Sequence, residues 1–240
     1  MARSDWRAQE IRRVMTFTGS KEKTARDALE KFDWNVEVAI DHILNSPQMD
    51  LSGAGKVFDK YRDAASDEID LDGTIQYITD LGLSLEEPTV LAVAMTAGSP
   101  SVGTFTRKPF VEGWAAIGGD SLAAQQKLCK AFAQSMTTLN ADFQKIYKFT
   151  YGFLLQEGQR VLPQETAVDY WRLLLTGKYE HLDKWLTFVT EKYKRNISKD
   201  AWNMLYEFML FQAKDPSLES YDEDGAWPSV IDEYVEFLKE

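Results

Sequence analysis

The chain has 240 residues, of which 44% are hydrophobic, and its formal net charge is −11 at pH 7. This composition supports a buried core and excludes a globally disordered chain. The negative charge disfavours nonspecific binding to nucleic-acid phosphates and favours basic protein surfaces as partners. The single cysteine, Cys129, excludes a disulfide framework and a cysteine-based zinc site.

No apolar run approaches the 18 or so residues that a membrane-spanning helix needs. The first ten residues, MARSDWRAQE, lack the apolar stretch of a secretory signal peptide, and a lone cysteine suits a reducing compartment. We therefore expect a cytoplasmic and nuclear monomer that binds neither membranes nor nucleic acid.

Residues 1–46 predict a small domain of three short helices. A stop signal at Gly19 follows the first helix, and the helical spacing of apolar side chains involves Ile11, Val14, Met15, Ala25, Leu29, Phe32, Val36, Ala39, Ile40, Ile43 and Leu44. Up to residue 48, eight Lys or Arg balance eight Asp or Glu, so the acidic excess lies further along the chain. The periodicity then lapses in PQMDLSGAGK, residues 47–56, where Pro, Ser and Gly predict a linker.

Residues 57–240 read as one larger helical domain. Amphipathic segments such as SLAAQQKLCKAFAQSM, DFQKIYKFTYGFLLQ and KDAWNMLYEFMLFQAK follow one another, and Gly or Pro separates most of them. Sustained strand alternation is absent. The predicted fold class is all-α, with a small domain followed by a larger one.

The segment EIDLDGTIQYIT, residues 68–79, resembles a calcium-binding loop. Its first, third and fifth positions are Glu68, Asp70 and Asp72, and Gly73 stands at the sixth, but the twelfth is Thr79, where calcium needs a bidentate Glu. The stretch SPSVGTFTRKPF, in which Phe105 could pair with the first loop, has no acidic side chain. We therefore expect EF-hand-like helix–loop–helix motifs that bind no metal.

Candidate nucleophiles and bases are scarce. The chain has two histidines, His42 and His181, and Cys129 lies on an apolar-leaning segment with no base beside it. No P-loop, dinucleotide-binding or serine-hydrolase motif occurs. We expect no catalytic residue and no cofactor.

The end of the chain is strongly acidic. From Asp215 to Glu240 there are nine Asp or Glu and one Lys. Ile231, Tyr234, Val235 and Leu238 form the stripe that a helix would bury, and Asp232 lies off that stripe. Solvated carboxylates explain this composition, but Ala226 and Trp227 beside them favour a docking surface for a basic partner.

The segment KDAWNMLYEF, followed by YDEDGAWPSVIDEYVEF, resembles the signature of the defective-in-cullin-neddylation proteins, whose large domain is called the PONY or potentiating-neddylation domain. The segments YWRLLLTGKYEHLDKWLTFV and IDLDGTIQYITDL are similar to that domain as well, and FTGSKEKTARDALEKFDWNVEVAIDHILNS resembles the ubiquitin-associated (UBA-like) module that precedes it. The likeness covers nearly the whole chain, in the expected order.

The resemblance implies a scaffold-type ligase component without a thioester of its own. Such a protein promotes transfer of the ubiquitin-like modifier from its conjugating enzyme to a cullin lysine. The family's docking patch for the cullin C-terminal domain falls on Asp200, Ala226 and Asp232. The UBA-like module would bind ubiquitin, and the candidates for that contact are Phe17, Gly19, Ile43 and Leu44.

The resemblance also implies a hydrophobic pocket for the acetylated N-terminal methionine of the conjugating enzyme. The expected wall is uncharged, and it comprises Leu71, Val90, Val93, Ala94, Phe105, Phe153, Tyr170 and Leu173. The sequence departs from the family pattern at Thr74, Ala97 and Gly103.

Two other functions remain open at this point. An EF-hand-type calcium-binding regulatory protein is the first alternative, which calorimetry with calcium would distinguish. A hydrolase with an unrecognised site is the second, and only the abundance of carboxylates supports it.

Overall fold

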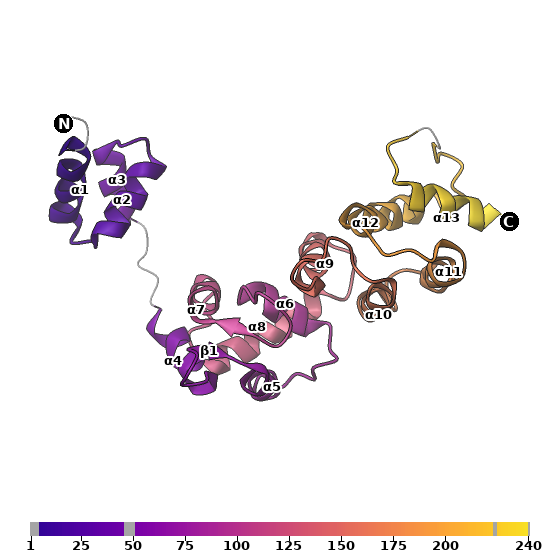
Figure 1. Ribbon diagram of the computed structural model, residues 1–240, viewed down its shortest axis with the longest axis horizontal. Coiled ribbons are helices and arrows are strands. Elements are labelled where there is room, and N and C mark those ends of the chain that lie inside the picture. Colours follow the sequence, from indigo (N-terminus) through magenta and orange to yellow (C-terminus); the bar gives the residue numbers. More distant parts are fainter. Residues whose placement is uncertain (1–4, 46–50, 223–224, 240) are drawn as a thin grey trace. The chain divides into compact units, whose positions relative to one another are not determined.

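The computed structural model describes residues 5–45, 51–222 and 225–239, and it is helical almost throughout (Figure 1). The chain divides into two compact units, Met1–Met49 and Asp50–Glu240. The all-α fold class is thereby confirmed. None of the described helices is both long and apolar enough to cross a membrane.

The first unit is a bundle of α1 (Asp5–Thr18), α2 (Glu22–Lys31) and α3 (Val36–Asn45). Gly19 ends α1 with a φ of +68°, and its amide donates to the Met15 carbonyl, as a left-handed helix cap requires. The buried core is small: Ile11, Val14, Ala25, Ala28, Leu29 and Ala39. The helical spacing in the sequence found most of these residues.

The second unit begins with α4 (Ser52–Tyr61), β1 (Glu68–Ile69), α5 (Leu71–Asp80), α6 (Thr89–Thr96), β2 (Phe105–Thr106), α7 (Arg107–Ala116) and α8 (Leu122–Ser135). The two strands pair antiparallel, with Ile69 opposite Phe105. Two helix–loop–helix motifs therefore share one short ribbon, as expected for an EF-hand-like pair.

The predicted linker is too long at its C-terminal end, because α4 already begins at Ser52. The glycines that suggested a linker belong to this helix. A Cβ at Gly53 would lie 2.2 Å from the Asp120 carbonyl oxygen, so glycine here allows close packing against the loop before α8.

The predicted register of the calcium-like loop is wrong. The sharp turn with positive φ, which glycine makes at the sixth position of a calcium loop, falls at Asp67 (φ +53°), and Gly73 lies inside α5. Counted from that turn, the first, third, fifth and twelfth positions are Arg62, Ala64, Ser66 and Gly73. None of these four side chains carries a carboxylate, so the ligand set that suggested calcium is lost.

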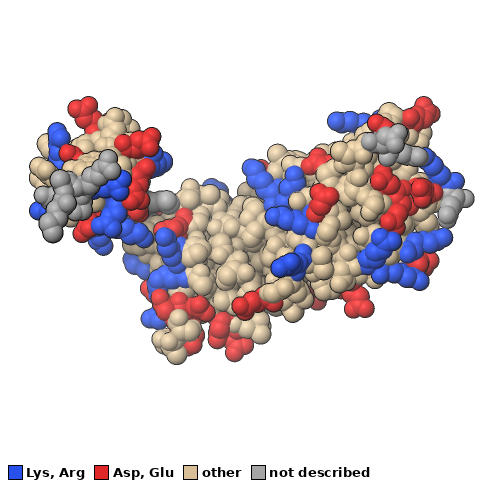
Figure 2. Space-filling view, turned by 45° about the horizontal axis from the view of Figure 1, so that its top comes forward, with Lys and Arg blue, Asp and Glu red and all other residues tan. Residues whose placement is uncertain are grey.

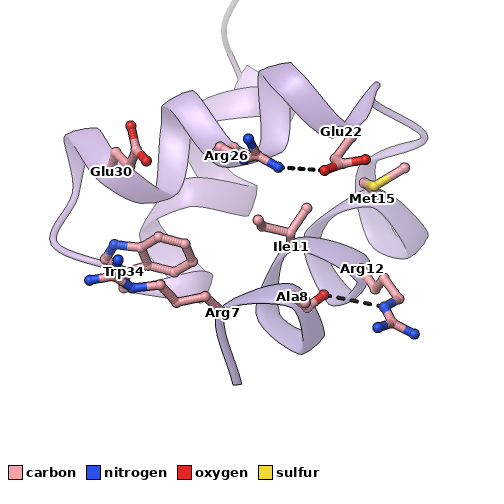
Figure 3. A pocket seen from close by; sticks show the side chains of 9 residues that line it. All are labelled: Arg7, Ala8, Ile11, Arg12, Met15, Glu22, Arg26, Glu30 and Trp34. Carbon is pink, nitrogen blue, oxygen red and sulfur yellow. Dashed lines mark hydrogen bonds and ion pairs between the residues drawn. The ribbon is translucent and has the colours of Figure 1, made fainter. Parts of the chain in front are cut away.

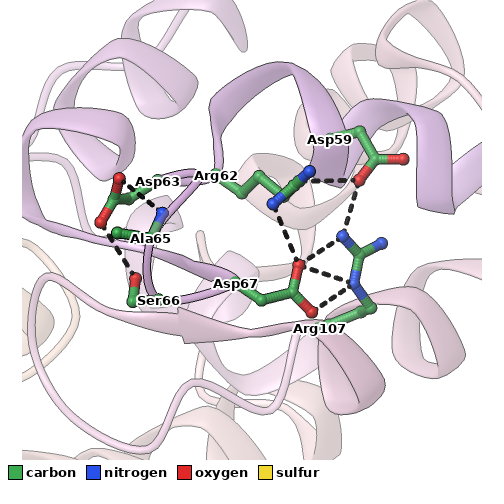
Figure 4. A network of polar contacts seen from close by, with 7 residues as sticks. All are labelled: Asp59, Arg62, Asp63, Ala65, Ser66, Asp67 and Arg107. Carbon is green, nitrogen blue, oxygen red and sulfur yellow. Dashed lines mark hydrogen bonds and ion pairs between the residues drawn. The ribbon is translucent and has the colours of Figure 1, made fainter.

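Two arginines and two aspartates form an ion-pair cluster at this turn. The Arg107 guanidinium donates to both carboxylate oxygens of Asp67 and reaches Asp59 at 2.6 Å, while Arg62 pairs with the same two aspartates (Figure 4). Arg107 thereby holds the pKa of Asp67 below its usual value. Among the described residues there is no group of three or more His, Cys, Asp or Glu that could hold a metal ion.

The rest of the unit comprises α9 (Ala141–Leu154), α10 (Gln164–Leu175), α11 (Leu182–Thr187), the π-helix η1 (Phe188–Tyr193), α12 (Lys199–Lys214) and α13 (Ser229–Lys239). A stack of rings forms the centre of its core. Trp202 of α12 lies parallel to Trp171 of α10, with centroids 5.2 Å apart, and to Tyr147 of α9 at 4.9 Å. The Trp171 indole donates to the Tyr147 hydroxyl, which donates to the Trp202 carbonyl, so every buried polar group of this stack is satisfied.

Candidate functional site

A cavity of about 220 Å³ opens in the second unit between the EF-hand-like pair and helices α9 and α10. Seven of the eight predicted wall residues line it: Leu71, Val90, Ala94, Phe105, Phe153, Tyr170 and Leu173. The eighth, Val93, is fully buried in the core around α4, α5 and α7 and does not line the cavity. Val93 and Ala94 are consecutive on α6, and of the two only Ala94 lines the cavity, because Val93 packs into that core.

The cavity has further lining residues that the sequence did not single out. Two of them, Leu85 and Val102, are 51% and 61% exposed, and the predicted wall residue Leu71 is 61% exposed. Large apolar side chains around the cavity are therefore accessible to solvent. The other additions are Thr74, Ile75, Ile78, Glu87, Leu91, Ser99 and Gly103. Two of the three departures from the family pattern, Thr74 and Gly103, are among them, whereas Ala97 is buried elsewhere.

The polar groups of this cavity are mostly occupied. Ser99 donates its hydroxyl hydrogen to main-chain oxygens of its own loop, and Glu87 accepts from the Ser84 amide. The Thr74 hydroxyl is buried without a hydrogen-bond partner. The cavity is thus mostly apolar and smaller than the 300–1,000 Å³ of drug-sized sites.

The predicted docking patch lies on α12, on α13 and on the segment between them, and these two helices pack against each other. Asp200 is exposed in the first turn of α12, where a negative charge complements the helix dipole. Ala226 is exposed in the segment before α13, and Asp232 is half-buried in the first turn of α13. Ile231, Tyr234 and Val235 are buried, as their spacing predicted.

A hydrogen bond fixes the Asp232 carboxylate, which accepts from the Tyr221 hydroxyl. The Tyr221 ring stacks on Trp227 with centroids 5.9 Å apart, and Trp227 packs edge-on against Phe208 and Phe211 of α12. These aromatic contacts anchor the segment between α12 and α13. The Asp232 carboxylate and Ala226 lie next to them.

Figure 2 shows Lys and Arg side chains interleaved with Asp and Glu at the C-terminal end of this unit. One basic residue reaches the tail directly, because Arg195 pairs with Glu233 at 3.4 Å. Arg195, in the segment that precedes α12, therefore partly offsets the negative charge of the tail.

In the first unit, the predicted ubiquitin contacts differ in exposure. Phe17 at the end of α1 is 66% exposed and Leu44 of α3 is 60% exposed. Ile43 packs against the bundle core, and Gly19 makes the turn after α1. Phe17 and Leu44 are thus the two side chains of the four that a partner could cover.

A second feature of this unit is a groove of about 590 Å³ between α1 and α2 (Figure 3). Arg7 lies over the ring of Trp34, with 4.8 Å from its guanidinium carbon to the ring centroid. Glu22 and Arg26 form an ion pair along α2, and Ile11 and Met15 line the groove from α1. The predicted ubiquitin contacts do not line it.

Comparison with known proteins gives two family matches. Residues 124–237 match the cullin-binding family model, and residues 8–48 match the UBA-like domain model. The chain is 94% identical, over the full length of both chains, to defective in cullin neddylation protein 1 of Yarrowia lipolytica. The chain belongs to the defective-in-cullin-neddylation family.

More distant family members also align with most of the chain. Defective in cullin neddylation protein 1 of Candida albicans is 31% identical over 92% of this chain and 93% of its own length. DCN1-like protein 3 of Homo sapiens is 35% identical over 82% of this chain and 65% of its own.

The cullin-binding match of this defective-in-cullin-neddylation chain covers all of one predicted site in the second unit and part of the other. It includes the whole acidic patch and the cavity residues Phe153, Tyr170 and Leu173, and it begins after the EF-hand-like pair. The UBA-like match lies in the first unit and contains Phe17 and Leu44.

The single cysteine and the two histidines of this family member lie in different surroundings. Cys129 is 2% exposed, and burial raises the pKa of its thiol to about 11. His181 precedes α11, and His42 packs edge-on against Phe32 in the first unit.

Proposed function

We propose that this chain promotes the neddylation of cullins as a scaffold that holds two partners at once. The acidic patch of Asp200, Ala226 and Asp232 binds a basic surface on the cullin C-terminal domain. The apolar cavity receives the acetylated N-terminal methionine of the conjugating enzyme. The chain contributes position rather than a reacting group, and we expect it in cytoplasm and nucleus.

The observation that carries this proposal is the rigid connection between the two sites. Tyr170 lines the cavity, its neighbour Trp171 stacks on Trp202, and Trp202 stands two residues after Asp200 on α12. Both sites therefore belong to one packed core. Holding two reactants on one rigid body raises their effective concentration and limits their relative orientations, and this accelerates transfer without new chemistry.

The first test is binding to a cullin C-terminal domain at two salt concentrations. Asp200→Arg reverses an exposed charge of the patch, and Glu157→Arg is a matched control because Glu157 is exposed in the loop after α9. We expect Asp200→Arg to weaken binding at least tenfold and Glu157→Arg to leave it within about twofold, because surface charges act locally at physiological salt. Equal affinities for the two variants would refute the assigned patch.

The second test uses a peptide with an acetylated N-terminal methionine. Leu71→Gln removes exposed apolar surface at the cavity, and Val161→Gln is the control, since Val161 is 40% exposed and does not line the cavity. Weaker peptide binding for Leu71→Gln alone supports the cavity as the binding site. The scaffold mechanism further requires that either single-site variant slows transfer of the modifier to the cullin while both remain folded.

The UBA-like unit adds a proposed contact with ubiquitin through Phe17 and Leu44. Both are large apolar side chains on the surface of a small domain, and such positions mark interaction sites when they adjoin. Loss of ubiquitin binding in Leu44→Gln, compared with wild type, would test this contact.

A further inference from the structure

A basic groove lies at the far end of α12 from the acidic patch. Two adjoining hollows of about 270 and 150 Å³ share His181, Gln212 and Pro216. Lys178, which precedes α11, lines the first, and Lys184 of α11 lines the second. We call the surface formed by the lining residues of these two hollows the lysine groove. Gln212 follows Asp200 by twelve residues, which at 1.5 Å per residue is about 18 Å along the helix.

The charge of the lysine groove is opposite to that of the chain. Its lining contains three lysines, Lys178, Lys184 and Lys239, against one carboxylate, Glu180. The whole chain carries −11. A local concentration of positive charge on an acidic protein attracts and orients an acidic ligand.

Two of these lysines lack an acidic partner. Lys178 donates to the Leu174 carbonyl at 2.9 Å and lies over the Phe143 ring, and no carboxylate among the described residues pairs with it or with Lys184. Burial lowers the pKa of Lys178. A partly desolvated ammonium group without a counter-charge is costly to keep, and an incoming carboxylate would relieve that cost.

The floor of the groove holds a side-chain amide whose orientation is fixed. Gln212 is 3% exposed, and its amide oxygen accepts from the Tyr179 hydroxyl at 2.7 Å, which fixes the orientation of the side chain. Its amide nitrogen makes no hydrogen bond to the described residues, and Gln212 lines both hollows. Met209, Pro216 and Leu238 supply apolar surface beside it.

We propose that the lysine groove binds an extended acidic peptide of a partner protein. Carboxylates of the peptide pair with Lys178 and Lys184, a main-chain carbonyl accepts from the Gln212 amide, and an apolar side chain covers Met209 and Leu238. Such a ligand matches three features of the groove. Its carboxylates match the positive charge, its main chain matches the fixed amide donor, and its extended length matches the two joined hollows. A small anion would use only the lysines.

The test is a fluorescence anisotropy titration of the full chain with the labelled peptide Asp-Glu-Leu-Asp-Glu-Leu. We expect Lys178→Gln/Lys184→Gln to weaken binding at least tenfold. Lys127→Gln/Lys130→Gln removes the same charge from exposed positions of α8 and should leave binding within about twofold. Gln212→Met keeps the approximate shape of the side chain, removes its donor together with the acceptor of the Tyr179 hydroxyl, and should weaken binding about fivefold.

Three results would overturn the proposal: no binding of the peptide by the wild-type chain, equal weakening in both double variants, or full displacement of the peptide by an equimolar amount of inorganic phosphate. The cullin measurement separates this site from the acidic patch. Lys178→Gln/Lys184→Gln should retain wild-type affinity for the cullin C-terminal domain, and a shared loss would place the lysine groove within the cullin contact instead.

Discussion

Replacing Gly113 by alanine should destabilise the protein, although the local rule predicts the reverse. Gly113 lies inside α7, and alanine in a helix interior is favoured over glycine by about 1 kcal/mol. A Cβ at this position would stand 1.8 Å from the Thr96 carbonyl oxygen at the end of α6. A main-chain carbonyl cannot rotate away, so α6 and α7 must separate.

The size of the effect follows from these two contributions. Overpacking costs about 1–3 kcal/mol when side chains can adjust, and a main-chain obstacle belongs at or above the upper end of that range. After subtraction of the gain in helix propensity, we expect the free energy of unfolding to fall by about 2 kcal/mol. For a unit of this size that corresponds to a melting temperature lower by roughly 4–8 °C.

The matched control is Gly152→Ala in α9, where no atom lies within 4 Å of the added Cβ. Here the gain in helix stability is unopposed, and the melting temperature should rise by roughly 2–4 °C. Tryptophan fluorescence follows the relevant transition, because five of the seven tryptophans lie in residues 50–240. A Gly113→Ala protein that melts at or above wild type would refute the close approach of α6 and α7.

Three other measurements test particular contacts. The Asp80 carboxylate accepts hydrogen bonds from Lys60 and Tyr61, which lower its pKa to about 2. The stability that the ionised carboxylate contributes is complete above pH 4 and is lost as the pH falls towards 2. Asp80→Asn should therefore lower the melting temperature at pH 7 and lower it much less at pH 2.5. A difference that does not change with pH would contradict the assigned pair. Cys129, with a pKa raised from 9.0 to about 11, should react with iodoacetamide at least about 100-fold more slowly in the native chain than in urea, and comparable rates would show that the thiol is not buried. Tyr221→Phe removes the donor to Asp232, so it should cost about 1 kcal/mol of stability in a urea titration and weaken cullin binding; unchanged cullin affinity would show that this hydrogen bond does not position the carboxylate.

The helical organisation could be predicted from the sequence because it depends on local spacing. Apolar residues at helical intervals located the bundle of the first unit and the buried face of α13, where Ile231, Tyr234 and Val235 are buried. The family likeness was also legible, because it depends on runs of consecutive residues such as KDAWN and GAWPSVIDEY. Composition alone established a buried core and an acidic tail.

Other features required the tertiary structure. The cavity combines residues from α5, α6, α9 and α10, and whether Val93 or Ala94 faces it depends on how α6 is rotated in the packed unit. The calcium-like loop was misplaced by the sequence because Asp67, not Gly73, makes its sharp turn, and Arg107 from a different helix stabilises that turn.

The close-packed glycine of α4 and the lysine groove also depend on contacts between segments that are distant in the sequence. Gly53 of α4 resembles a linker residue in the sequence. In the folded chain a Cβ at this position would lie 2.2 Å from the Asp120 carbonyl oxygen, so glycine is needed for packing. Lys178 and Gln212 lie 34 positions apart in the sequence and meet at one hollow only because α10, α11 and α12 pack together. Local periodicity determines which residues are helical and which face is apolar, whereas shared cavities and charge pairs depend on contacts between distant segments, which only the folded chain brings together.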